Sequence, residues 1–146
     1  MNTTPYIFLA DDDPDDCQFF REALEALLLS SSFTAVNDGE ELMQLLTKKD
    51  ENLPDILFLD LNMPRKTGFQ CLKEIKNDVG LSKIPVVIIS TSYDPTVANG
   101  LYQNGASYYI QKPIGFSQLQ KLISLAVELI TKKNMLRPKK INFLLG

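Results

Sequence analysis

The chain has 146 residues, of which 45% are hydrophobic and 23% charged, and its net charge is −3. This length and composition predict one globular domain with a core large enough to fold unaided. The negative balance argues against nucleic acid as a partner. No apolar run reaches the ~18 residues that a membrane span needs, so we expect no transmembrane segment. The first five residues lack the features of a secretory signal, and a cytoplasmic location is the expectation.

Five short apolar runs alternate with five segments of helical periodicity. The strand-like runs are residues 6–10, 33–36, 56–59, 86–89 and 108–111. The helical segments are 15–29, a leucine-rich stretch opening at 38–39, 68–77, a stretch between Asp94-Pro95 and Asn104-Gly105, and 116–133. Strict alternation predicts an α/β fold with a parallel sheet and right-handed crossovers. The continuous apolarity of the third and fourth runs indicates strands covered on both faces.

Four of the five runs end in polar residues that carry chemistry. The first is followed by Asp11, Asp12 and Asp13, the third by Asp60, the fourth by Ser90 and the fifth by Lys112. Ligands of open parallel sheets bind beyond the carboxyl ends of the strands. If the runs are neighbouring strands, their tips place carboxylates, a hydroxyl and an ammonium in one pocket that suits a divalent cation and a phosphoryl group.

The carboxylates pose an electrostatic problem that a metal ion would solve. Two like charges ~4 Å apart at an effective dielectric of ~20 cost roughly 4 kcal/mol. Mg²⁺ takes oxygen ligands and keeps several waters, so a few carboxylate and carbonyl oxygens suffice to hold it. The alternative is a solvated turn and helix start, where acids are favoured by the helix dipole. We prefer that interpretation for Asp13, Asp15 and Asp16, and it stays open for Asp11 and Asp12.

Asp60 ends an otherwise apolar strand, and a carboxylate in such a position can attack phosphorus to form an aspartyl phosphate. Taken singly, Asp60 could be a helix cap, Lys112 a surface lysine and Ser90 a loop hydroxyl. Their joint occurrence at corresponding strand ends favours the phosphoryl site. The sequence contains no histidine, which removes imidazole as base, metal ligand or phosphoryl carrier. Cys17 and Cys71 follow no metal or redox spacing and are expected to be reduced thiols.

Four segments in order resemble the receiver domain of bacterial two-component response regulators, of the chemotaxis-regulator type. They are residues 8–14 (FLADDDP), 57–64 (LFLDLNMP), 85–91 (PVVIIST) and 105–113 (GASYYIQKP). The resemblance covers about residues 6–133. It implies a doubly wound (βα)5 fold with five parallel strands in the flavodoxin-like order 2-1-3-4-5. It implies a phosphorylated switch rather than an enzyme.

The resemblance also implies a role for each site residue. Asp60 would accept the phosphoryl group from a histidine kinase or a histidine phosphotransfer protein. Asp12 and Asp60 would bind Mg²⁺ directly, Asp11 through water, and Asn62 through its backbone carbonyl. Lys112 would neutralise a phosphoryl oxygen, and the bond between Lys112 and Pro113 is expected to be cis.

The switch implied by the resemblance uses two further residues. Ser90 would move to hydrogen-bond the phosphoryl group, and Tyr109 would swing into the vacated space. This would alter the face built by the fourth helix, the fifth strand and the fifth helix, to which an unidentified protein target would bind. The same face makes a homodimer possible. Tyr108 precedes Tyr109, so the strand register decides which tyrosine can act.

Residues 1–134 are expected to form the receiver domain and residues 135–146 a basic, then apolar tail without an output domain. A disordered end is the expectation for this tail, with packing on the domain or on a partner as the alternatives. The run from Asp12 to Asp16 (DDPDD) also resembles that of small stand-alone regulators paired with phytochrome-type kinases.

Two other functions stay open at this point. One is a Mg²⁺-dependent phosphatase with Asp11 as nucleophile, since Asp11-x-Asp13 follows an apolar strand. The other is a degenerate receiver that binds partners without being phosphorylated. The intact set of Asp12, Asp60 and Lys112 argues against the second.

Overall fold

The computed structural model describes residues 5–27, 32–48, 52–113, 115–132 and 138–146. Its parallel sheet has the order β2-β1-β3-β4-β5-β6. The strands are β1 (Tyr6–Ala10), β2 (Ser32–Val36), β3 (Ile56–Asp60), β4 (Val86–Ser90), β5 (Tyr108–Gln111) and β6 (Leu144–Leu145). The predicted order 2-1-3-4-5 is confirmed, and β6 adds a short sixth strand beside β5.

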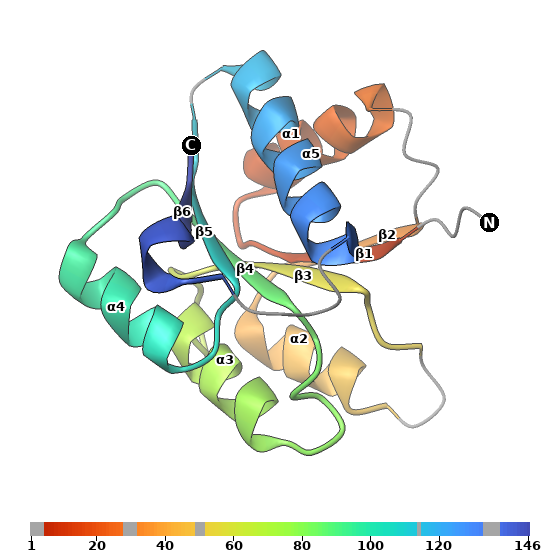
Figure 1. Ribbon diagram of the computed structural model, residues 1–146. Helices are drawn as coiled ribbons and strands as arrows, with labels where there is room; N and C mark the ends of the chain where they lie inside the picture. The colour runs from red at the N-terminus through yellow and green to blue at the C-terminus, as the bar shows by residue number, and fades with distance from the viewer. Residues whose placement is uncertain (1–4, 28–31, 49–51, 114, 133–137) are drawn as a thin grey trace.

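Five α-helices cover the two faces of the sheet (Figure 1). They are α1 (Pro14–Ala26), α2 (Gly39–Leu46), α3 (Gly68–Asn77), α4 (Pro95–Gln103) and α5 (Phe116–Lys132). In Figure 1, α1 and α5 lie on one face, and α2, α3 and α4 lie on the other. The doubly wound α/β prediction is therefore confirmed.

Each face of the sheet has its own hydrophobic core, because successive side chains of a strand point to opposite sides. Along β3, Leu57 and Leu59 join the core under α2, α3 and α4, whereas Phe58 joins the core under α1 and α5. All three side chains are fully buried. A strand that is apolar at every position needs helices on both of its faces, as the sequence predicted.

Side-chain caps determine where the helices begin. Asp13 accepts hydrogen bonds from the backbone N–H groups of Asp15 and Asp16, so α1 begins at Pro14, one residue earlier than predicted. Asp94 caps α4 in the same way, with Pro95 as the first helical residue, which confirms that prediction. Proline suits this position because its missing N–H would have no partner inside the helix.

The described part of the C-terminal tail, residues 138–146, joins the folded sheet. A 3₁₀ turn at Lys140–Asn142 leads into β6, which pairs with β5 in parallel. The N–H of Tyr109 donates to the carbonyl of Phe143 at 2.9 Å, and the Phe143 side chain is 4% exposed. For residues 138–146, the expectation of a disordered end is wrong, and the structure shows the alternative of packing on the domain.

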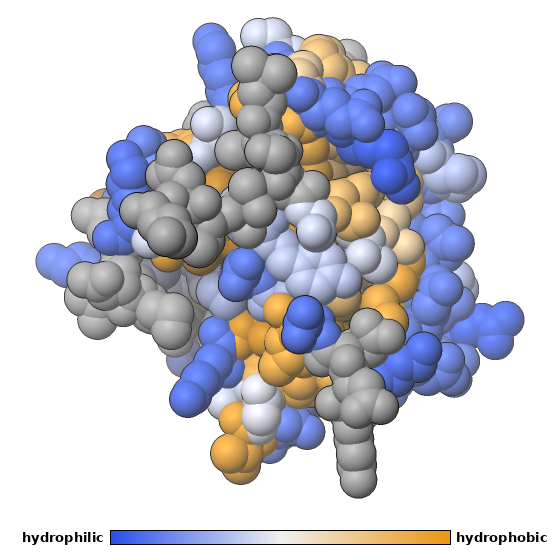
Figure 2. Space-filling view, turned by 90° about the vertical axis from the view of Figure 1, so that its right-hand side faces the viewer, coloured by the Kyte–Doolittle hydropathy of each residue, from blue (hydrophilic) through white to orange (hydrophobic). Residues whose placement is uncertain are grey.

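Figure 2 shows the side of the molecule at which β1 and β3 start, where hydrophobic and hydrophilic side chains alternate over the surface. Leu53, which precedes β3, is one of the partly exposed apolar residues of the chain. Within the described ranges, no helix has the length and hydropathy to cross a bilayer. The acidic strand ends lie at the opposite end of the sheet.

Candidate functional site

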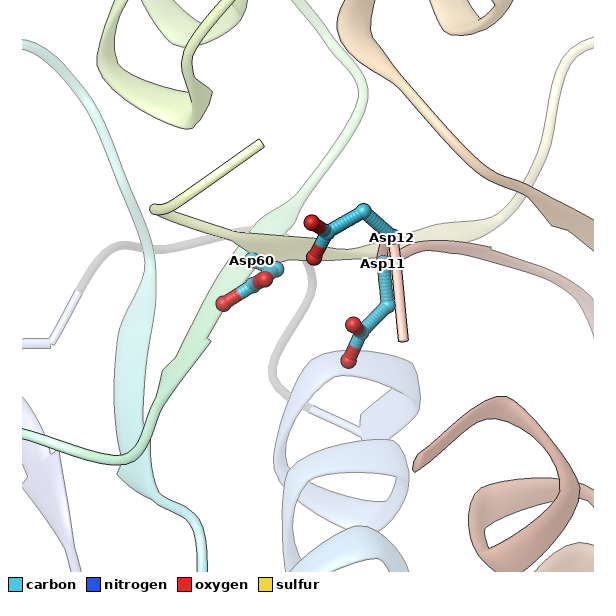
Figure 3. Close-up of side chains that lie close together, drawn as sticks. All are labelled: Asp11, Asp12 and Asp60. Atoms are coloured by element: carbon cyan, nitrogen blue, oxygen red, sulfur yellow. The ribbon is translucent and has the colours of Figure 1, made fainter. Parts of the chain in front are cut away.

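The ends of β1 and β3 bring three carboxylates together (Figure 3). Asp11 and Asp12 directly follow β1, and Asp60 is the last residue of β3, its neighbour in the sheet. One carboxylate oxygen of each residue lies within 4.8 Å of the other two. Asp11 and Asp60 are buried, whereas Asp12 is exposed. Three acidic oxygens at this spacing suit a hard divalent cation with open positions for water.

Lys112 supplies the positive charge of the site. It follows β5, and its ammonium lies 2.8 Å from Asp11 Oδ2, 2.8 Å from Asp16 Oδ2 and 3.7 Å from Asp60 Oδ1. The first two distances are hydrogen bonds, and the third is too long to be one. The structure thus brings the predicted residues Asp11, Asp12, Asp60 and Lys112 into one cluster.

The two oxygens of Asp11 are both engaged. Oδ1 accepts a hydrogen bond from the backbone N–H of Asp13 at 3.0 Å, and Oδ2 accepts from Lys112 at 2.8 Å. A carboxylate held in this way, with 1% of its surface exposed, is poorly placed to attack an incoming phosphorus atom. The geometry therefore disfavours Asp11 as a phosphatase nucleophile.

Burial and charge shift the protonation equilibria of the cluster. Burial raises the pKa of the Asp60 carboxyl to about 6, with Lys112 opposing the shift and Asp11 and Asp12 adding to it. Burial also raises the pKa of Asp11, against the hydrogen bond from Lys112. For Lys112, burial alone would lower the pKa, but the hydrogen bonds to Asp11 and Asp16 outweigh it and the pKa is raised. All three shifts favour the protonated forms, so the site favours the binding of a further positive charge.

A stability measurement can test whether a cation relieves this repulsion. The pKa of Asp60 is higher in the folded chain than its ordinary value of 3.8, so the folded state binds more protons than the unfolded one between these values. The contribution of Asp60 to the free energy of unfolding therefore falls as the pH rises through about 6. We expect millimolar Mg²⁺ to raise the free energy of unfolding by about 2 kcal/mol at pH ~7.5 and much less at pH ~5, where protons compete.

The measurement is urea unfolding followed by circular dichroism, with and without Mg²⁺ at both pH values. NaCl at matched ionic strength is the control, because screening alone acts on exposed charges throughout the molecule. An equal Mg²⁺ effect at both pH values would contradict a site built on Asp60.

The loop after β3 is shaped by a close backbone approach. A Cβ at Gly68 would lie 2.2 Å from the carbonyl oxygen of Asp60, so only glycine fits where α3 begins. Arg65 in the same loop has a φ of 68°, in the left-handed region. Asn62 is exposed beside the cluster, and its backbone N–H donates to Asp60 and opposes the rise of the Asp60 pKa. Its role as a metal ligand stays a prediction.

Ser90 and Tyr109 lie together on one face of the sheet. Ser90 is fully buried, and Tyr109 is 1% exposed. Burial raises the pKa of Tyr109, and a hydrogen bond with the Ser90 side chain opposes the shift. The Tyr109 hydroxyl also donates to the Ser92 carbonyl. Tyr108 faces the opposite core, so the register selects Tyr109 as the neighbour of Ser90. Tyr109 already points inward here, and its swing stays a prediction.

One expectation at the site is wrong, and one residue was missed. The described ranges contain no cis peptide bond, so Lys112 and Pro113 are joined in trans. Asp16 contacts Lys112, although the sequence favoured a solvated helix start for it. Nothing in the local sequence separates Asp16 from Asp15, because the partner lies 96 residues away.

Comparisons with known proteins agree with this geometry. A family model described as the response regulator receiver domain matches residues 7–124. The chain is 33% identical over 122 residues to the two-component response regulator ORR11 of Oryza sativa subsp. indica, covering 82% of this chain and 79% of that protein. It is 29% identical over 126 residues to response regulator Rcp1 of Synechocystis sp., covering 84% and 86%.

Solved structures show the same similarity. The phosphorylated cyanobacterial phytochrome response regulator RcpA matches with a TM-score of 0.81 and 32% identity, covering 90% of this chain and 96% of that one. The Mn²⁺-bound form of response regulator Rcp1 matches with a TM-score of 0.77 and 26% identity, covering 92% and 99%. The sheet order, the acidic cluster and the family match lead to one conclusion: the chain belongs to the response regulator receiver domain family.

Proposed function

We propose that the chain accepts a phosphoryl group on Asp60 from the phosphohistidine of a histidine kinase or a histidine phosphotransfer protein. The observation that carries this proposal is the placement of Asp60 beside charges of both signs. Its carboxylate lies close to those of Asp11 and Asp12, and the ammonium of Lys112 lies 3.7 Å from Asp60 Oδ1. This arrangement serves a nucleophile that receives a dianionic group.

The chemistry needs little from the chain beyond position and charge. Asp11, Asp12 and Asp60 would hold Mg²⁺, with the Asn62 carbonyl as a further ligand, and the bound ion would neutralise phosphoryl oxygens. Lys112 would hydrogen-bond a phosphoryl oxygen. The Mn²⁺-bound form of Rcp1 supports the binding of a divalent cation by this chain. The chain has no histidine, so the phosphodonor imidazole has to come from a partner.

The readout of phosphorylation would pass through Ser90 and Tyr109 to the surface of α4, β5 and α5. Ser92 supports this route as a link between the two residues, because its N–H donates to Ser90 Oγ and its carbonyl accepts from the Tyr109 hydroxyl. Tyr109 then changes its contact with Tyr93, whose ring centroid lies 5.2 Å away on the α4 side. A protein target, or a second copy of the chain, would recognise the altered surface.

The proposal also covers the partner kinase and the location of the chain in the cell. The names of RcpA and of its relatives link those proteins to phytochromes, and a phytochrome-type histidine kinase is the partner that we propose for this chain. A cytoplasmic location would give the chain access to such a kinase. Residues 1–134 would act as the receiver and residues 135–146 as an appended tail, with β6 joined to the receiver's sheet.

The test is phosphoryl incorporation from acetyl phosphate and Mg²⁺, followed by reduction of the aspartyl phosphate with borohydride and peptide mapping. We expect one phosphoryl group on Asp60 and none without the divalent cation. Label on Asp11, or many turnovers of an added phosphoester, would instead support the phosphatase. Partner binding that is unchanged between phosphorylated and unphosphorylated protein would support the degenerate receiver.

A further inference from the structure

Asp16 shares the ammonium of Lys112 with Asp11. Both carboxylates lie 2.8 Å from Lys112 Nζ, although Asp11 follows β1 and Asp16 is in the first turn of α1. The Lys112 side chain is 14% exposed and that of Asp16 37%, so this contact lies at the rim of the site and is partly shielded from water. Charge-assisted hydrogen bonds of this kind are short and directional.

The contact with Asp16 bears on the distance between Lys112 and Asp60. An ammonium has three N–H donors. Two of them are used by Asp11 and Asp16, and Asp60 Oδ1 lies at 3.7 Å, beyond hydrogen-bond length. Lys112 therefore makes no direct hydrogen bond to Asp60, and its third N–H is left over.

We infer that Asp16 is a positioning residue that holds Lys112 off Asp60 until a phosphoryl group arrives. The inference rests on the proposed function of Asp60. With Asp16 in place, the Asp60 carboxylate is free to attack, and the third N–H of Lys112 is available to an oxygen of the incoming group. Without Asp16, the ammonium keeps Asp11 and shortens its 3.7 Å ion pair with Asp60 to a direct hydrogen bond, which has to break before each transfer.

The reaction step that Asp16 serves transfers the phosphoryl group of acetyl phosphate to Asp60. An Asp60 oxygen forms a bond to phosphorus while the bond from phosphorus to the acetate oxygen breaks, and acetate leaves with the electron pair. The phosphoryl oxygens then come within reach of the Lys112 ammonium, which lies 3.7 Å from Asp60 Oδ1 in the unphosphorylated chain. Asp16 touches neither phosphorus nor the leaving group and acts only through Lys112.

Asp15 is the matched control for Asp16. It lies in the same first turn of α1 and carries the same charge, so it interacts with the helix dipole in the same way. Its side chain is exposed and is absent from the ion pairs of Lys112 in the described residues. A general effect of negative charge at the helix start acts through both residues, whereas the positioning of Lys112 depends on Asp16 alone.

The experiment measures the rate of Asp60 phosphorylation against acetyl phosphate concentration at saturating Mg²⁺. For Asp16→Asn we expect the limiting rate to fall about tenfold, the effect of one lost charge-assisted hydrogen bond, with little change in the half-saturating concentration. Asp15→Asn should stay within about twofold of wild type, and Asp16→Glu, which keeps the carboxylate, should recover to within about threefold. In a Lys112→Met background, Asp16→Asn should have no additional effect.

The outcomes separate this inference from the function on which it rests. If wild type is not labelled on Asp60, the proposed function fails. If wild type is labelled and Asp16→Asn matches Asp15→Asn, or is faster than wild type, the positioning inference fails by itself. An undiminished effect of Asp16→Asn in the Lys112→Met background also overturns it. Urea unfolding of each variant shows whether a rate change comes from lost folding.

Discussion

Replacing Asp60 with Asn is expected to abolish phosphorylation and to stabilise the fold. A carboxamide has the shape of the carboxylate but is not a nucleophile toward phosphorus, so incorporation from acetyl phosphate should fall by at least about 10³-fold. The same change removes the buried charge whose pKa is raised to about 6. In metal-free buffer at pH ~7.5, we expect the free energy of unfolding to rise by about 1–2 kcal/mol, because a shift of about two pKa units is offset in part by the lost attraction to Lys112.

A loss of phosphorylation together with a gain in stability distinguishes a functional residue from a structural one. Phosphoryl incorporation is followed on Phos-tag gels, and stability by urea unfolding with EDTA present. Asp15→Asn is the control, with the same charge change at an exposed position, and should alter neither quantity much. A loss of both activity and stability in Asp60→Asn would mean that the carboxylate mainly supports the fold.

Phe143→Ala is expected to cost about 3 kcal/mol of stability, although the residue is the fourth from the end of the sequence. The Phe143 side chain is 4% exposed, and its ring centroid lies 5.3 Å from that of Tyr102 and 6.2 Å from that of Tyr109. Its backbone carbonyl accepts the N–H of Tyr109, which ties the tail to β5. Loss of the Phe143 ring leaves a cavity between α4, β5 and the tail, so the tail should also detach from β5 more readily.

Ile141 provides the control on the same segment. Its side chain is 88% exposed, so Ile141→Ala should change the free energy of unfolding by no more than about 0.5 kcal/mol. Hydrogen exchange of the Tyr109 amide reports on the tail directly, and Phe143→Ala should speed it up while Ile141→Ala does not. Equal stability of the two variants would show that the tail contributes nothing to the fold.

Much of this fold could be predicted because its signals are local. Alternating apolar runs and helical stripes gave the order of elements, and Asp94-Pro95 marked the start of α4 to the residue. The candidate site was predictable for the same reason. In a parallel sheet, residues that end neighbouring strands meet at one edge, so Asp11, Asp60 and Lys112 follow from the strands alone.

Other features depend on contacts that local sequence does not encode. Tyr108 and Tyr109 are adjacent aromatic residues in one strand, and a shift of one residue in register exchanges their faces. The apolar tail was expected to be disordered, but the open edge of β5 offers unpaired backbone groups, and β6 pairs with them. The Lys112–Pro113 bond was expected to be cis and is trans.

The amino-acid sequence by itself therefore determined the α/β class, the start of α4 and the acidic and basic strand ends, since each depends on spacing along a few residues. Only the tertiary structure decided that Tyr109 packs beside Ser90, that the tail completes the sheet, and that Asp16 holds Lys112. Asp15 and Asp16 are the same residue type on the same turn. Which of them reaches an ammonium 96 residues further along depends on how α1 packs against the sheet.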